Sequence, residues 1–133
     1  MSRFDPDVSV DGARNTVLEV NIIVDDERGI TPSMLLDINK AHRDPRTPPK
    51  TYRVDWIEYI LHKDLEVDLW WQTKDAPRLL RHLEGRGKME LEARGGAHNT
   101  ADHKTGCVLL SATGWTKGSN PIVGSLTIHA TKH

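Results

Sequence analysis

The stretch that decides the fold is residues 65–72, which read Leu-Glu-Val-Asp-Leu-Trp-Trp-Gln. Residues 65, 67, 69 and 71 are apolar and the residues between them are polar, apart from Trp70. This alternation indicates a β-strand with one buried face, because successive side chains of a strand point to opposite sides of its sheet. We therefore expect a strand whose outer face carries an unusual Trp70.

Four further stretches show similar patterns on either side of this strand. Residues 16–24 are rich in β-branched side chains and apolar on both faces, because Val17 and Ile23 add apolar surface to the second face. Such a strand lies centrally in a sheet or beneath another subunit. Residues 52–61 alternate with a change of phase that predicts a bulge near residues 56–58. Residues 107–113 and 122–130 complete the set.

Two segments carry helix signals. Thr31 as an N-cap, followed by Pro32 at the first helical position, predicts a short helix ending near Lys40 or Ala41. Residues 76–84 fit either a short helix stopped by Gly85 or a strand leading into a hairpin turn at residues 85–87. The sequence leaves this second choice open.

These elements predict a mainly β fold, an antiparallel β-sandwich of six or seven strands with one short helix, jelly-roll or Greek-key-like. With 133 residues the chain suits one domain. We expect residues 1–14 to form an extended N-terminal arm that becomes ordered on docking, and residues 15–133 to form a single β-sandwich domain.

Composition excludes several classes. No apolar run approaches the roughly 20 residues of a membrane span, and the N-terminus carries no apolar signal segment. The single cysteine, Cys107, cannot form an internal disulfide, which fits synthesis in a reducing compartment. With 18 basic and 19 acidic side chains, the chain lacks the net positive charge of a general nucleic-acid binder. We expect neither membrane nor direct nucleic-acid binding.

The chemical motifs are weak. A zinc site would need His98, Asp102, His103 and Cys107, but these residues lack the paired ligand spacing of zinc sites, so we predict no metal and no cofactor. For hydrolysis, Ser111 or Ser125 with His129 lacks the Gly-x-Ser-x-Gly turn. Glu66 and Asp68 lie about 7 Å apart on one strand face and fit solubilising charges. The sequence predicts that the protein is not an enzyme.

The residues predicted to contact partners are those that break the expected pattern. Val17 and Ile23 are the extra apolar residues of strand 16–24, and Trp70 is an outward residue of a type enriched at interface centres. Arg43 and Arg46 lie in the Pro-rich loop 41–50, whose basic side chains suit an acidic partner surface.

From Trp56 to the C-terminus, the chain resembles small structural proteins of tailed-bacteriophage virions, as found in cyanophages and other marine phages. The resemblance rests on the order of four pieces: Val54-Asp55-Trp56-Ile57-Glu58-Tyr59, Val67-Asp68-Leu69-Trp70-Trp71, Gly85-Arg86-Gly87-Lys88-Met89-Glu90-Leu91, and Thr105-Gly106-Cys107-Val108-Leu109-Leu110-Ser111. A closing strand with basic terminal residues follows.

This resemblance implies a capsid decoration or cement protein, made in the host cytoplasm and located in the virion. Its partners would be the major capsid protein or other virion proteins, and it would form a homo-oligomer, with a trimer favoured. Two alternatives stay open: a head–tail or tail component, and a carbohydrate- or ligand-binding sandwich that uses Trp70 or Trp115 as a stacking platform.

Overall fold

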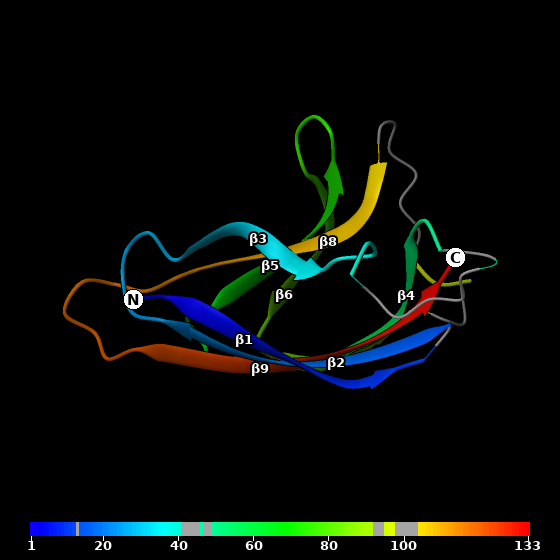
Figure 1. Ribbon diagram of the computed structural model, residues 1–133. Helices are drawn as coiled ribbons and strands as arrows, with labels where there is room; N and C mark the ends of the chain where they lie inside the picture. Colours follow the sequence, from blue (N-terminus) through cyan, green and yellow to red (C-terminus); the bar gives the residue numbers. More distant parts are fainter. Residues whose placement is uncertain (13, 41–45, 47–48, 92–94, 98–103) are drawn as a thin grey trace.

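The computed structural model describes residues 1–12, 14–40, 46, 49–91, 95–97 and 104–133 (Figure 1). Within these residues the chain forms nine strands and no helix, which confirms the mainly β class but exceeds the predicted six or seven strands. The strands are β1 (Arg3–Asp11), β2 (Asn15–Val24), β3 (Ile30–Leu36), β4 (Tyr52–Leu61), β5 (Glu66–Thr73), β6 (Arg78–Glu84), β7 (Arg86–Glu90), β8 (Lys104–Thr113) and β9 (Ile122–Lys132). No helix in this part of the chain has the length and apolar character needed to cross a membrane.

The strands form two antiparallel sheets. One sheet has five strands in the order β1-β2-β9-β4-β7, and the other has four in the order β3-β8-β5-β6. Figure 1 shows them as two layers, with β1, β2 and β9 in one and β3, β5 and β8 in the other. Only β1–β2 and β5–β6 are neighbours both in sequence and in a sheet, so every other connection crosses between the layers.

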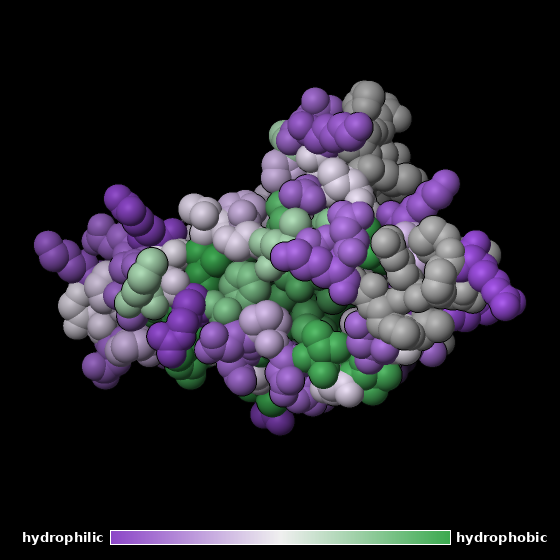
Figure 2. All heavy atoms as spheres, viewed as in Figure 1, coloured by the Kyte–Doolittle hydropathy of each residue, from purple (hydrophilic) through white to green (hydrophobic). Residues whose placement is uncertain are grey.

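The inward side chains of both sheets form one hydrophobic core. Val67 and Leu69 on β5 are fully buried, as are Ile57 on β4 and Leu110 on β8. The inward phase predicted for residues 65–71 is therefore confirmed. Apolar residues gather in the middle of the molecule between the two layers, with hydrophilic residues towards the ends (Figure 2). Because side chains fill this interior, sites for partners must lie on the outer faces and at the loops.

The short helix predicted after Thr31 is wrong. Residues 30–36 form β3, which pairs with β8 through Met34 and Leu109. The register shifts between Ile30 and Ser33, and the Ser33 hydroxyl donates to the carbonyl of Thr31 at 2.7 Å. Pairing with β8 outweighs the local capping signal, so the segment forms a strand. The polar Thr-Pro-Ser run appears as an irregularity within that strand.

The choice left open at residues 76–84 is resolved as a strand, because residues 78–84 form β6. The predicted hairpin at residues 85–87 is wrong, since β6 and β7 belong to different sheets. Gly85 has a φ of 70°, a left-handed conformation that glycine adopts without strain, and it redirects the chain from one layer to the other. β7 then pairs with β4 through Met89 and Ile57.

The first fourteen residues, predicted as an arm that orders on docking, include β1. This strand pairs with β2 from Arg3↔Ile23 to Asp11↔Thr16. Both ends of the strand are held by side chains. The Ser2 hydroxyl donates to Asp26 Oδ1 at 2.9 Å, and the Lys132 ammonium contacts Asp11. β1 is the edge strand of the five-stranded sheet, and these contacts within the chain hold both of its ends.

Candidate functional site

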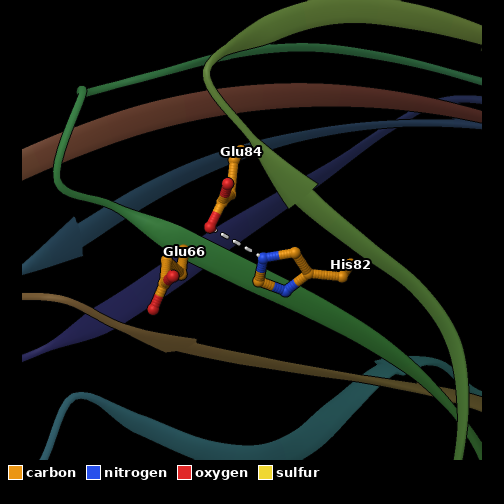
Figure 3. Close-up of side chains that lie close together, drawn as sticks. All are labelled: Glu66, His82 and Glu84. Carbon is orange, nitrogen blue, oxygen red and sulfur yellow. Dashed lines mark ion pairs between the residues drawn. The ribbon is translucent and has the colours of Figure 1, made fainter.

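Four polar side chains share the outer face of the four-stranded sheet where β5 meets β6. In the ladder, Glu66 lies opposite Glu84 and Asp68 lies opposite His82. Residues two apart on a strand share a face, so these four side chains form a square that we call the acidic–imidazole quartet. Figure 3 shows three of its members, with His82 and Glu84 directed at each other from the same strand and Glu66 beside them on β5.

Both ring nitrogens of His82 face carboxylates. Nδ1 lies 2.5 Å from Asp68 Oδ1, and Nε2 lies 3.0 Å from Glu84 Oε1. The hydrogen bonds to Glu84 and then to Asp68 raise the pKa of His82, because both carboxylates favour the charged ring. In return, His82 lowers the pKa of Glu84.

The quartet holds more negative charge than one imidazole can balance. Glu66 and Glu84 are directly opposite across the ladder, and the hydrogen bond between their carboxyl groups raises the pKa of Glu66. Two carboxyl groups can share such a bond only while a proton lies between them. One ligand-type atom from each of Glu66, His82 and Glu84 lies within 4.8 Å of the others, so these residues could hold a metal ion.

Trp70 lies farther along β5 on the same outer face. It is half-buried, and its indole Nε1 donates to the Ser111 hydroxyl on β8 at 2.8 Å. Its ladder partner on β6 is Leu79, which is 50% exposed. Its ladder partner on β8 is Leu109, which pairs in turn with the exposed Met34 on β3. The predicted partner residue Trp70 therefore has apolar neighbours on both sides.

The predicted partner residues Val17 and Ile23 lie at opposite ends of the outer face of the five-stranded sheet. Val17 is half-buried and lines a cavity of about 700 Å³. Ile23 is half-buried and lines a second hollow of about 580 Å³ with Ile60 and Val123, each of which is 54% exposed.

The other two predicted partner residues come from the loop 41–50. Arg46 is exposed, and Arg43 lies outside the described residues.

The cavity at Val17 has an aromatic and charged lining. Trp56 stacks on His129 with ring centroids 3.6 Å apart, and Lys88 Nζ lies 4.6 Å from the Trp56 ring centroid. The strands that carry His129 and Lys88 flank β4 on opposite sides. These two side chains therefore cover Trp56, and its ring offers little free surface to a stacking ligand.

A bulge shapes the wall of this cavity. The register shifts between Val54 and Trp56, close to the position predicted from the phase change. Asp55 lies at the bulge and accepts from Arg53 Nε at 2.7 Å and from the Thr131 hydroxyl at 2.6 Å. Arg53 is thus held by its neighbour on the strand.

The serine and histidine residues considered for hydrolysis do not converge. Ser111 lies on β8 and bonds to Trp70, whereas His129 lies on β9 in the other sheet. Ser125 shares β9 with His129, but four residues of strand separate them by roughly 13 Å. Neither serine is placed to exchange a proton with His129.

Of the residues considered for zinc, the structure describes only Cys107. This thiol is buried on β8, its Sγ donates to Asp37 Oδ1 at 3.5 Å, and burial raises its pKa. His98, Asp102 and His103 lie outside the described residues.

Trp115, proposed above as a stacking platform, packs partly against the core. Its indole nitrogen is buried and has no hydrogen-bond partner among the described residues. The ring lines a hollow of about 480 Å³ with side chains of the β2–β3 turn, including Arg28.

His82 and Glu84 could not be identified as site residues from the sequence, because residues 76–84 fit either a helix or a strand. Glu66 and Asp68 were noticed but interpreted as solubilising charges. A prediction that residues 78–84 form a strand paired with residues 66–73 would have placed Glu84 opposite Glu66. The missing information was therefore the pairing of two strands, which single-strand periodicity does not contain.

Comparisons with known proteins do not assign a family. No protein-family model matches the chain, and no curated protein matches it. One solved structure with a similar trace is Peruvianin-I, a cysteine peptidase from Thevetia peruviana latex, at 6% sequence identity and a TM-score of 0.36. The match covers 94% of this chain and 60% of that chain. A likeness of this size carries no conclusion about fold or activity.

Proposed function

We infer that strands β2 to β9 form a jelly-roll sandwich to which β1 adds one edge strand. Counting β2 as the first of eight strands, the sheet orders become 1-8-3-6 and 2-7-4-5. Two interleaved Greek keys produce this order, and the jelly roll is the double-sheet fold built from them. Viral capsid proteins and lectins are among the proteins with this fold. The fold is therefore compatible both with a structural role and with ligand binding.

The observation that carries a structural role is an apolar trio on the outer face, made of the half-buried Ile23 and the exposed Ile60 and Val123. Ile23 and Val123 are ladder partners on β2 and β9, and Ile60 lies on β4 at the far side of β9. The outer face of an antiparallel sheet in water is ordinarily polar. Covering such side chains contributes about 25 cal/mol per Å² of apolar surface, which favours a protein partner there.

The proposed function is that of a non-enzymatic virion structural protein, most closely a capsid decoration or cement protein of a tailed phage. The resemblance from Trp56 onwards and the apolar trio support it. In this proposal the trio joins copies of the chain into a closed homotrimer, because closed symmetry lets one patch serve every copy. The face around Trp70 contacts the major capsid protein and clamps neighbouring capsid subunits.

Quantitative mass spectrometry of purified phage particles tests the location. A cement protein is expected at hundreds of copies per head, and its removal should lower the temperature at which heads release DNA. A dozen copies or fewer would instead support the head–tail or tail alternative. Absence from washed particles would contradict a virion role.

A pair of variants tests the apolar trio. Ile60→Gln with Val123→Gln should shift sedimentation from the oligomer to the monomer, because two exposed apolar contacts are lost. The matched control is Thr127→Gln, which changes a half-buried residue on the same face and strand as Val123. Thermal unfolding should stay within a few degrees of the parent for all variants, since exposed sites contribute little stability. An unchanged oligomer in the double variant would contradict self-association through the trio.

The cavity at Val17 favours a second candidate, a carbohydrate- or ligand-binding module. Its volume of about 700 Å³ falls in the range of small-molecule sites. A glycan array with the purified chain separates the candidates, and Asp55→Asn should abolish any binding that uses this cavity. Specific glycan binding lost in that variant would favour the module over the cement protein.

A further inference from the structure

The acidic–imidazole quartet has the ligand set of a divalent metal site. Glu84 and His82 present ligand atoms 3.0 Å apart, and Glu66 completes a group within 4.8 Å. Neighbouring ligands around a metal with bonds of about 2.1 Å lie roughly 3.0 to 3.4 Å apart, so the first pair is at the short end of this range. A side-chain rotation of Glu66 would bring the third ligand to the same distance.

Asp68 gives His82 the environment of a metal-bound histidine. Such a histidine usually donates its other ring N–H to a carboxylate, which fixes the tautomer and the ring orientation. The Asp68 carboxylate lies 2.5 Å from Nδ1, so Nε2 is the nitrogen left facing Glu66 and Glu84. Asp68 sits outside the ligand group and positions the ring.

The opposed glutamates also favour a cation. Like charges directly across an antiparallel ladder are destabilising, and Glu66 lies directly opposite Glu84. A divalent ion held between the two side chains would offset the repulsion between these two carboxylates. An imidazole among the ligands favours zinc-like ions over calcium and magnesium, which prefer oxygen.

We propose that Glu66, His82 and Glu84 bind one zinc-like divalent cation on the outer face of β5 and β6, with Asp68 as the positioning residue. The site is exposed, so water completes the coordination sphere. This inference concerns the isolated chain and does not depend on a role in the virion.

Isothermal titration of chelator-treated protein with zinc chloride at about pH 7 tests the site. We expect one zinc ion per chain and loss of that ion in His82→Gln and Glu84→Gln. Asp68→Asn should weaken binding about tenfold, as removal of a positioning carboxylate does. The matched control is His62→Gln, because His62 is also paired with a nearby carboxylate, at 3.8 Å from Asp64, but belongs to no three-residue group of the described residues.

Three results would overturn the proposal. The first is no saturable zinc binding up to about 1 mM. The second is unchanged binding in His82→Gln, which would place the ion elsewhere, for example at His98 and His103. The third is calcium binding as tight as zinc binding, which would reduce the quartet to an acidic surface. Circular dichroism of each variant without metal checks folding, which substitution of an exposed side chain should preserve.

Discussion

The two sheets of this protein share one core but differ in what their outer faces carry. The five-stranded sheet has apolar side chains at both ends of its outer face, at Val17 and at the trio, and an added edge strand fastened by side chains. The four-stranded sheet carries hydrogen-bonded polar groups, the acidic–imidazole quartet and the pair Trp70–Ser111, next to the exposed apolar side chains of Leu79 and Met34.

This difference shows that the same alternation of inward apolar and outward side chains can produce outer faces with different properties. In each sheet the inward phase is apolar and fills the core, so the outward phase is free to differ. On the five-stranded sheet, the outward phase supplies apolar area suited to a protein partner. On the four-stranded sheet, it supplies groups that bind one another and suit an ion. Three predictions test this contrast, beginning with the largest effect on stability.

The first prediction concerns the fastening of β1 to the five-stranded sheet. The Lys132 side chain is buried, and its ammonium contacts Asp11 and donates to the Gly12 carbonyl at 2.7 Å. Asp11→Asn should lower the free energy of unfolding by about 2 kcal/mol, because a buried ammonium loses its countercharge. The figure is below that of a fully buried pair because Asp11 is about one-third exposed. Urea unfolding measures the change.

The double variant Asp11→Asn with Lys132→Met is the control for this prediction. It removes the buried charge together with its partner, so part of the lost stability should return. If Asp11→Asn alone leaves the unfolding midpoint unchanged, the pair does not fasten β1. The contrast between the sheets would then rest on the outer faces alone.

The second prediction concerns the polar network of the four-stranded sheet. Trp70→Phe removes the indole donor and leaves the largely buried Ser111 hydroxyl without it. The expected loss is about 1 kcal/mol, the net contribution of one hydrogen bond. A double-mutant cycle with Ser111→Ala should give a coupling energy of similar size. A coupling energy near zero would mean that Trp70 is held by its apolar neighbours only.

Local sequence patterns predicted several of the strands correctly but not which strands pair with one another. The alternation in residues 65–72 predicted both the strand and its buried phase, and the phase change near Trp56 predicted a bulge close to its place. The Thr31-Pro32 signal failed because pairing of Met34 with Leu109 outweighed the capping preference. A ladder such as Ile57↔Ile128 joins distant parts of the chain, and no local period encodes it.

The candidate sites divide in the same way. Val17, Ile23 and Trp70 could be identified from the sequence because each breaks the pattern of its own strand. The quartet could not, because its members become neighbours only when β6 pairs with β5. Glu66 and Asp68 on one strand are ordinary surface charges. Only together with His82 and Glu84 across the ladder do they form a hydrogen-bonded group that could hold a metal ion.

The smallest expected effect tests the other fastening of β1, at Ser2. The Ser2 hydroxyl donates to Asp26 and lowers the pKa of that carboxyl group, and the Gly29 backbone N–H donates to the same group at 2.9 Å. Because the pKa is lower in the folded state, this contact adds stability above the ordinary Asp pKa and loses it as the pH falls through the folded value. Ser2→Ala should raise the pKa of Asp26 without restoring it fully, since Gly29 still donates. Carbon-detected NMR titration of the carboxyl group measures the shift, and Ser9→Ala within β1 should cause none. If Ser2→Ala also caused none, the Ser2 hydroxyl would not contribute to holding this end of β1.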